Sequence, residues 1–196
     1  MRLNILYVPS YSPSKNSNKT PLENRLKDYV YKRFSVNSWN SAPQAQGEFN
    51  FEEYKNLIQR IIITFINSNE PKSIRIIGAS FGGGIIHKIL SEINNKLSIK
   101  IFLYKPILIS RIEELSKIEN FKILGLPQEF PIKNQFSISF YKIYYVFGDR
   151  DSLTGKPENL FDSIDYSKLF ILLNSTHNSK KDEFPEFENF FINFIS

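Results

Sequence analysis

Short, almost entirely apolar segments alternate with longer amphipathic segments along most of this sequence, and this alternation restricts the fold more than any other feature. The segments expected to form strands are 3–8, 34–38, 73–77, 99–104, 141–147 and 168–173. The segments expected to form helices are 21–32, 51–67, 81–94, 157–163 and 183–195. Strands that are apolar on both faces must be covered on both faces. The order therefore predicts an α/β fold, a mostly parallel sheet of about six strands with helices on both sides.

Length and composition indicate one folded domain. The chain has 196 residues, of which 41% are hydrophobic and 23% charged, values typical of a globular protein with a substantial core. We expect a single domain over 1–196. Segment 109–135, between the fourth and fifth expected strands, interrupts the alternation. We predict that it forms a small lid, with a short helix over 111–118.

Composition also excludes several classes of function. The sequence has no cysteine, which excludes disulfides, thiolate metal ligands and a cysteine nucleophile. The net charge of +5 comes from dispersed residues, without a basic stripe interleaved with aromatics, so we expect no nucleic-acid partner. No apolar run approaches the ~20 residues of a membrane span, and the first run is too short for a secretory signal. A cytoplasmic location is expected, and the oligomeric state is not indicated.

The segment from Gly78 to Gly82 reads Gly-Ala-Ser-Phe-Gly and lies between an expected strand and an expected helix. This G-x-S-x-G pattern in a strand–turn–helix context is typical of a nucleophile elbow, with Ser80 as the nucleophile. Side chains at 78 and 82 would collide with neighbouring elements in so tight a turn. The backbone N–H of Phe81, at the start of the helix, is expected to stabilise an oxyanion. The glycine patterns of phosphate-binding loops are absent from this turn.

The sequence has two histidines, and their positions predict different roles. His177 follows the last expected strand and precedes the C-terminal helix, where a general base for Ser80 is needed. His87 lies inside the helix that leaves the elbow, so the helix carries its side chain away from Ser80. We predict that His177 is the base and that His87 has a packing role.

Residues 148–151 read Gly-Asp-Arg-Asp and end another expected strand, upstream of His177. With the G-x-S-x-G segment and the order Ser, Asp, His, the sequence resembles the α/β-hydrolase superfamily over nearly its whole length. In that family G-x-x-D after the penultimate strand supplies the acid, and the resemblance implies that Asp151 completes a Ser–His–Asp triad. Two alternatives stay open: Asp149 is the acid, or Asp151 only caps the following turn.

The sequence departs from the family pattern after the first strand. Where the family often has His-Gly, this chain has Pro9-Ser10, followed by Tyr11. We expect the backbone N–H of Tyr11, or alternatively that of Ser10, to be the second oxyanion donor. Segment 11–20, rich in Ser, Asn and Pro, is expected to surround the entrance.

The implied chemistry is hydrolysis of a small carboxylic ester or thioester through an acyl-enzyme on Ser80. Such a mechanism needs no metal and no organic cofactor. Two alternatives use the same sequence features: an acyltransferase in which an alcohol replaces water, and a catalytically silent binding protein on the same fold. The pattern does not identify the substrate or its acyl length.

Overall fold

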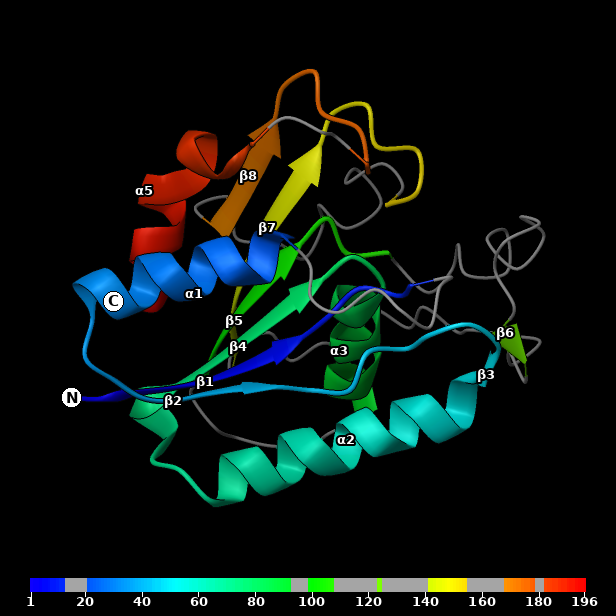
Figure 1. The fold of residues 1–196 in the computed structure, drawn as a ribbon, viewed down its shortest axis with the longest axis horizontal. Helices are drawn as coiled ribbons and strands as arrows, with labels where there is room; N and C mark the ends of the chain where they lie inside the picture. The colour runs from blue at the N-terminus through cyan, green and yellow to red at the C-terminus, as the bar shows by residue number, and fades with distance from the viewer. Residues whose placement is uncertain (13–20, 93–98, 108–122, 125–140, 155–167, 179–181) are drawn as a thin grey trace.

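A computed structural model of the chain describes residues 1–12, 21–92, 99–107, 123–124, 141–154, 168–178 and 182–196. Its main feature is a six-stranded sheet in the order β2-β1-β4-β5-β7-β8 (Figure 1). These strands are β1 (Leu3–Val8), β2 (Val36–Ser41), β4 (Ile74–Ala79), β5 (Ile99–Tyr104), β7 (Tyr141–Gly148) and β8 (Leu169–Leu172). All five neighbouring pairs are parallel. The expected α/β fold with a mostly parallel sheet is confirmed.

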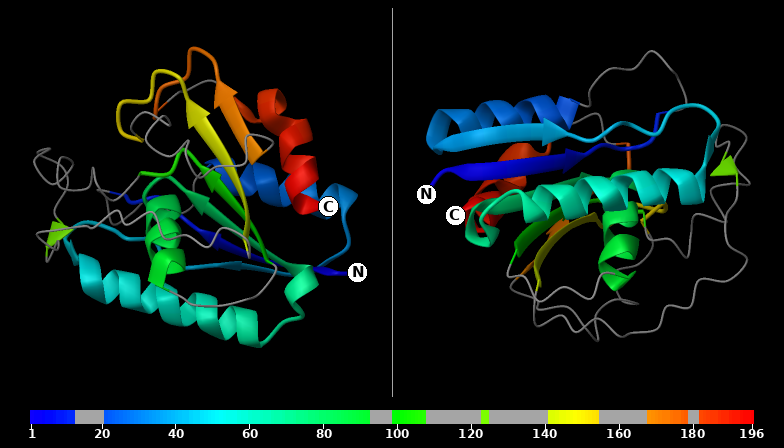
Figure 2. Two further views of the ribbon diagram at one scale, coloured as in Figure 1. Left: turned by 180° about the vertical axis from the view of Figure 1, so that it is seen from behind. Right: turned by 90° about the horizontal axis from the view of Figure 1, so that it is seen from below.

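Helices cover both faces of this sheet. The helices are α1 (Pro21–Arg33), α2 (Phe51–Asn67), α3 (Phe81–Glu92) and α5 (Phe184–Ile195), with a short 3-10 helix at Pro71–Ser73. Helices α1 and α5 lie on one face, and α2 and α3 lie on the other (Figures 1 and 2). Among the described helices, none is long and apolar enough to cross a membrane.

The two faces carry separate cores because successive side chains of a strand point to opposite faces. In β1, Ile5 and Tyr7 belong to the core beneath α1 and α5, whereas Leu6 and Val8 belong to the core beneath α2 and α3. Four phenylalanines at helical spacing form the buried face of α5, namely Phe184, Phe187, Phe191 and Phe194. Three of them, Phe187, Phe191 and Phe194, surround Phe102 of β5 at ring-centroid distances of 5.1–5.9 Å. This packing fixes α5, and with it the end of the chain, against the sheet.

Several boundaries differ from those expected. The second strand covers Val36–Ser41 rather than 34–38, because Phe34 donates a backbone hydrogen bond of 2.8 Å to Val30 and so extends the turn of α1. The C-terminal helix begins at Phe184, and Glu183 is its N-cap residue rather than part of the helix. A two-stranded parallel sheet of β3 (Phe49–Asn50) and β6 (Ile123–Leu124) was not expected.

Some expectations lie outside the described residues. These are the helices predicted over 111–118 and 157–163, the end of the helix predicted over 81–94, and most of segment 109–135. Within 109–135 the structure describes Ile123–Leu124 alone, as strand β6. The lid and the single-domain organisation therefore stay predictions.

Candidate active site

Ser80 is the single residue between the end of β4 and the start of α3, as a nucleophile elbow requires. Its φ angle is +51°, in the left-handed region that residues other than glycine rarely adopt. Such a conformation costs on the order of 1–3 kcal/mol and persists only where the surroundings hold it. Here Ser80 N donates to Tyr104 O at 2.8 Å, and Ser80 O accepts from Ile107 N at 3.0 Å and from Gly84 N at 3.1 Å.

The glycines around Ser80 are needed because neighbouring elements approach their Cα atoms closely. A Cβ at Gly78 would lie 2.5 Å from Ile86 Cδ1, and a Cβ at Gly82 would lie 2.3 Å from Pro9 O. At Gly84 a Cβ would lie 1.9 Å from the carbonyl oxygen of Ile107. The expectation that side chains at 78 and 82 would collide with other elements agrees with this geometry.

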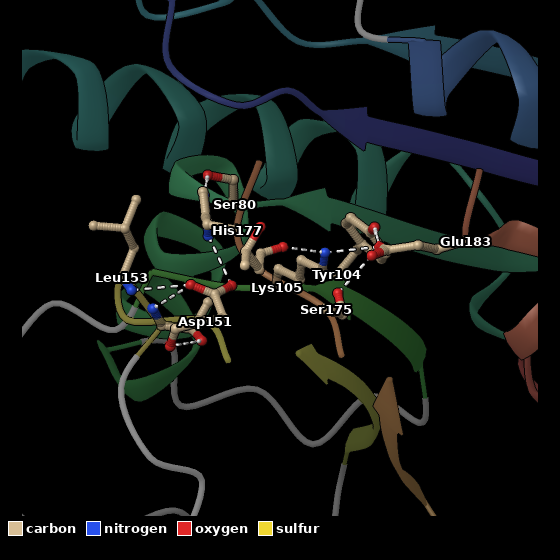
Figure 3. A network of polar contacts seen from close by, with 10 residues as sticks. Ser80, Tyr104, Lys105, Asp151, Leu153, Ser175, His177 and Glu183 are labelled. Carbon is tan, nitrogen blue, oxygen red and sulfur yellow. Dashed lines mark hydrogen bonds and ion pairs between the residues drawn. The ribbon is translucent and has the colours of Figure 1, made fainter. Parts of the chain in front are cut away.

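The structure brings Ser80, His177 and Asp151 together in a continuous chain of hydrogen bonds (Figure 3). Ser80 Oγ lies 2.7 Å from His177 Nε2, and His177 Nδ1 lies 2.9 Å from Asp151 Oδ2. With the proton on Nδ1 donated to the carboxylate, Nε2 is free to accept the hydroxyl hydrogen of Ser80. The three side chains follow β4, β7 and β8, whose carboxyl ends lie at one edge of the sheet.

Asp151 is buried and ionised. Its other oxygen, Oδ1, accepts hydrogen bonds from the backbone N–H groups of Leu153 at 2.9 Å and Thr154 at 3.2 Å. Burial alone would raise the pKa of Asp151, but the hydrogen bonds from His177, Leu153 and Thr154 outweigh it and lower the pKa. Asp151 thus caps the following turn with one oxygen and bonds His177 with the other.

Asp149 has a different hydrogen-bond partner from Asp151. Its Oδ1 accepts a hydrogen bond of 3.0 Å from the backbone N–H of Ser175, two residues before His177. Backbone hydrogen bonds from Asn174 and Ser175 lower the pKa of this exposed carboxylate. Of the two aspartates, it is Asp151 that hydrogen-bonds His177.

His87 is on α3, half-buried, with its ring 6.3 Å from the ring of Tyr145 in β7. Burial lowers the pKa of His87 to about 4, so this imidazole is neutral at neutral pH. It takes no part in the hydrogen-bond chain of Ser80, and its location agrees with the predicted packing role.

The loop after β1 lies against the start of α3, where both oxyanion donors are expected. The ring of Phe81 is fully buried and lies 6.2 Å from that of Tyr11. Tyr11 Oη donates to Gly47 O at 2.9 Å, and Gln44 Nε2 donates to Ser10 O at 2.8 Å. These contacts hold the loop beside Ser80, while the donor roles of the Phe81, Tyr11 and Ser10 N–H groups stay predictions.

The sequence analysis did not identify two buried charged residues beside this site, Lys105 and Glu183 (Figure 3). Lys105 Nζ lies 2.7 Å from Glu183 Oε2 and donates a hydrogen bond of 2.6 Å to the carbonyl oxygen of Thr176. Tyr104 Oη and Ser175 Oγ also donate to the Glu183 carboxylate. One signal for Lys105 was present in the sequence: a lysine directly after an apolar strand, at the same edge of the sheet as Ser80.

In the part of the chain that the structure describes, no group of three or more His, Cys, Asp or Glu side chains is arranged so that it could hold a metal ion. The side chains that the structure joins at this edge of the sheet are those of Ser80, His177 and Asp151. Together they form a hydroxyl, a base and an ionised acid in the order that acyl transfer requires.

Comparisons with known proteins show what this architecture is similar to. No protein-family model and no curated protein matches the sequence. Among solved structures, esterase PE8 is 12% identical, with a TM-score of 0.61 over 98% of this chain and 93% of that one. The α/β hydrolase GrgF from Penicillium sp. is 11% identical, with a TM-score of 0.56 over 98% and 90%. The capsule O-acetyltransferase of Neisseria meningitidis serogroup A is 18% identical, with a TM-score of 0.54 over 99% and 88%. At such low identity the comparisons establish a shared fold.

Proposed function

We propose that this chain, which has the α/β-hydrolase fold, is a serine hydrolase that cleaves a small carboxylic ester or thioester. The observation that carries the proposal is the hydrogen-bond chain from Ser80 through His177 to Asp151, with Ser80 held in a left-handed turn. A serine that served only packing would need neither the strained backbone nor an imidazole at 2.7 Å.

Acylation begins when Ser80 Oγ attacks the carbonyl carbon of the substrate while its proton moves to His177 Nε2. The carbonyl π electrons move to oxygen, and the backbone N–H of Phe81, with that of Tyr11 or Ser10, stabilises the oxyanion. Asp151 stays ionised throughout, keeps the proton of His177 on Nδ1 and stabilises the imidazolium. The intermediate then collapses, the bond to the leaving alkoxide or thiolate breaks, and His177 gives its proton to the leaving group.

Deacylation repeats these steps with water. His177 Nε2 takes a proton from the water as its oxygen attacks the acyl-enzyme, and the imidazolium then returns this proton to Ser80 Oγ. The products are a carboxylic acid and an alcohol or thiol. The chain has no disulfide whose formation would require an oxidising compartment, and we propose that the protein acts in the cytoplasm.

An acyltransferase is the second candidate, favoured by the fold shared with the capsule O-acetyltransferase. In that reaction an alcohol replaces water in the second half, and the same three residues act in the same way. The two functions differ in product: an acyltransferase gives a new ester when an acceptor alcohol is supplied, whereas a hydrolase gives the free acid.

The deciding experiment is covalent labelling by a fluorophosphonate probe, measured by intact-protein mass, together with hydrolysis of p-nitrophenyl acetate. Wild-type protein should gain one probe adduct, and Ser80→Ala should gain none and lose hydrolysis. Ser68→Ala is the matched control, because Ser68 Oγ bonds to Thr64 O at the far end of α2. Wild-type protein that neither labels nor hydrolyses would contradict the proposal and favour a binding protein. Ser80→Ala that labels like wild type would contradict it by placing the nucleophile at another residue.

A further inference from the structure

We propose that Lys105 is a positioning residue for His177, and that the buried pair of Lys105 and Glu183 exists to fix the loop that carries the base. The expected effect of Lys105 on kcat rests on the function proposed above, whereas its expected effect on the position of the His177 ring does not. The inference assigns a role to two charged residues that the acyl-transfer mechanism itself does not use.

The contact that carries the inference joins Lys105 to the peptide bond leading into His177. Lys105 Nζ donates to Thr176 O at 2.6 Å, and the carbonyl group of Thr176 is bonded to the nitrogen of His177. A peptide unit is planar, so holding this oxygen fixes the plane from which His177 extends. The ring nitrogens of His177 must reach Ser80 Oγ and Asp151 Oδ2 at once, and a small rotation of this plane would break one of the two contacts.

The rest of the loop is held from two other directions. From the turn after β7, Asp149 accepts from Ser175 N at 3.0 Å, and Arg150 N donates to Ser175 O at 3.0 Å. From the start of α5, Glu183 accepts from Ser175 Oγ. Lys105 holds Thr176, the residue directly before His177, so that Ser175 and Thr176 are both fixed.

Glu183 in turn orients Lys105. Although Glu183 is the N-cap residue of α5, its side chain makes no capping hydrogen bond to that helix and instead faces Lys105, Tyr104 and Ser175. Burial alone would raise the pKa of Glu183, but hydrogen bonds from Lys105, Ser175 and Tyr104 lower it, so the carboxylate stays charged. Only 2% of the Lys105 side chain and 5% of the Glu183 side chain are exposed, so both ends of the pair are withdrawn from water.

Stability does not account for this arrangement. A buried ion pair loses the hydration of both charges, and a well-packed apolar pair of similar volume is often as stable or more stable. In addition, Lys105 adopts a φ angle of +43°, a left-handed conformation that costs free energy in any residue except glycine. Its backbone N–H donates to Val146 O at 2.7 Å, which holds this conformation. An amine aimed at Thr176 O explains why a lysine occupies this place.

The test compares Lys105→Met with the double variant Lys105→Met/Glu183→Met. The single variant leaves Glu183 buried without its cation and is expected to be less stable, whereas the double variant removes both charges and should fold. Tyr104→Phe is the matched control, because it removes one hydrogen bond to Glu183 and leaves the contact between Lys105 and Thr176 O in place. Lys105→Arg tests rescue by a residue that keeps the positive charge.

Two readouts are used. In hydrolysis of p-nitrophenyl acetate, both methionine variants should lose about 100-fold in kcat with KM within about twofold, the effect expected when a reacting group is displaced by about 1 Å. The low-field proton resonance of His177 Nδ1–H, followed by NMR, should broaden or vanish in both. Tyr104→Phe should keep kcat within about threefold and retain the resonance, and Lys105→Arg should recover part of kcat.

A folded double variant with wild-type kcat and an unchanged His177 resonance would overturn the inference. If wild-type protein neither labels nor hydrolyses, the proposed function fails, and the resonance alone then decides the positioning role. Its loss in the folded double variant supports that role, and its persistence overturns it.

Discussion

The Asp149 carboxylate accepts a 3.0 Å hydrogen bond from the backbone N–H of Ser175, so it holds the loop that carries His177 rather than His177 itself. Asp151, two residues further along the chain, bonds the imidazole at 2.9 Å. Of the two carboxylates in this short turn, that of Asp149 thus bonds the backbone of the loop and that of Asp151 bonds the imidazole.

We expect Asp151→Asn to lower kcat far more than Asp149→Asn. An amide at 151 cannot stabilise the imidazolium and permits the wrong imidazole tautomer, a change that costs about 10⁴-fold in kcat in a trypsin-like triad. An amide at 149 still offers an oxygen to Ser175 N, so kcat should stay within about threefold. Steady-state hydrolysis of p-nitrophenyl acetate checks both variants, and the reverse ranking would assign the acid to Asp149.

Gly82→Ala should destabilise the fold and impair the site far more than Gly83→Ala. A Cβ at 82 meets the backbone oxygens of Val8 and Pro9 at 2.5 and 2.3 Å, so the end of β1 must move. A Cβ at 83 would lie 3.0 Å from Pro106 Cβ, 3.2 Å from Pro106 Cα and 3.3 Å from Gly78 O, contacts that require shifts of only a few tenths of an ångström. The higher helix propensity of alanine offsets part of their cost, by about 1 kcal/mol.

Urea unfolding should give Gly82→Ala a free energy of unfolding at least about 2 kcal/mol below that of Gly83→Ala, the size of a typical overpacking penalty. Fluorophosphonate labelling should also be slower in Gly82→Ala, because the loop with the expected second oxyanion donor follows β1. Equal stability and equal labelling rates in the two variants would contradict the close approach of β1 to α3.

His87 should make stability depend on pH between about 6.5 and 4. Burial lowers the pKa of His87 to about 4, below the ordinary value of 6.5, so the unfolded chain takes up a proton first as the pH falls. Stability from the neutral imidazole is therefore fully present above pH 6.5 and is lost progressively toward pH 4. By the linkage between protonation and folding, the free energy of unfolding should fall by about 2 kcal/mol between pH 7 and pH 5.

The measurement is urea unfolding of wild type and His87→Gln at both pH values. The decrease in the free energy of unfolding from pH 7 to pH 5 should be about 2 kcal/mol smaller in His87→Gln than in wild type. Because each protein is compared with itself at the two pH values, the packing cost of the substitution cancels. The carboxylates with lowered pKa values, Asp151 and Glu183, affect stability only as the pH falls through their unfolded values near 4 and below. A similar loss in both proteins would mean that His87 is accessible to protons in the folded state.

Ser80→Gly should be more stable than Ser80→Ala. The backbone φ of +51° is unfavourable for alanine by about 1–2 kcal/mol but not for glycine, while the greater freedom of glycine in the unfolded chain returns part of this difference. We expect a net advantage of about 0.5–1 kcal/mol for Ser80→Gly in urea unfolding. An alanine variant of equal or greater stability would show that the elbow holds Ser80 without strain.

The elements that the sequence predicts correctly are those with a strong local pattern. The bounds of β1, β5 and α2 agree with the predicted ranges, since each is dominated by apolar residues at the spacing of its structure. Strand β2 was misplaced for the opposite reason. It is an edge strand with the mostly polar sequence Val-Asn-Ser-Trp-Asn-Ser, in which Val36 and Trp39 are only partly buried against the core, and its bounds follow its pairing with β1.

The same distinction applies to the candidate site. Ser80, Asp151 and His177 stand out because each lies in a short motif or directly after a strand. Lys105 and Glu183 do not, because their role depends on contacts between distant parts of the chain. Lys105 meets Thr176 across 71 positions, and Tyr104 meets Glu183 across 79. No local rule links a lysine at the end of β5 to the N-cap of a helix that begins after β8.

The all-parallel strand order also has a consequence for folding kinetics. Ser80 and His177 are 97 positions apart, and β8, the edge strand that precedes His177, has four residues. Among the described strands, β8 pairs with β7 alone. Parallel pairs need long crossovers, and chains dominated by such distant contacts fold slowly. Helices with local hydrogen bonds form early, whereas β8 can join only after β7 is in place. During refolding, the hydroxyl and the imidazole should therefore meet in the last phase, after far-UV circular dichroism has recovered most of its signal.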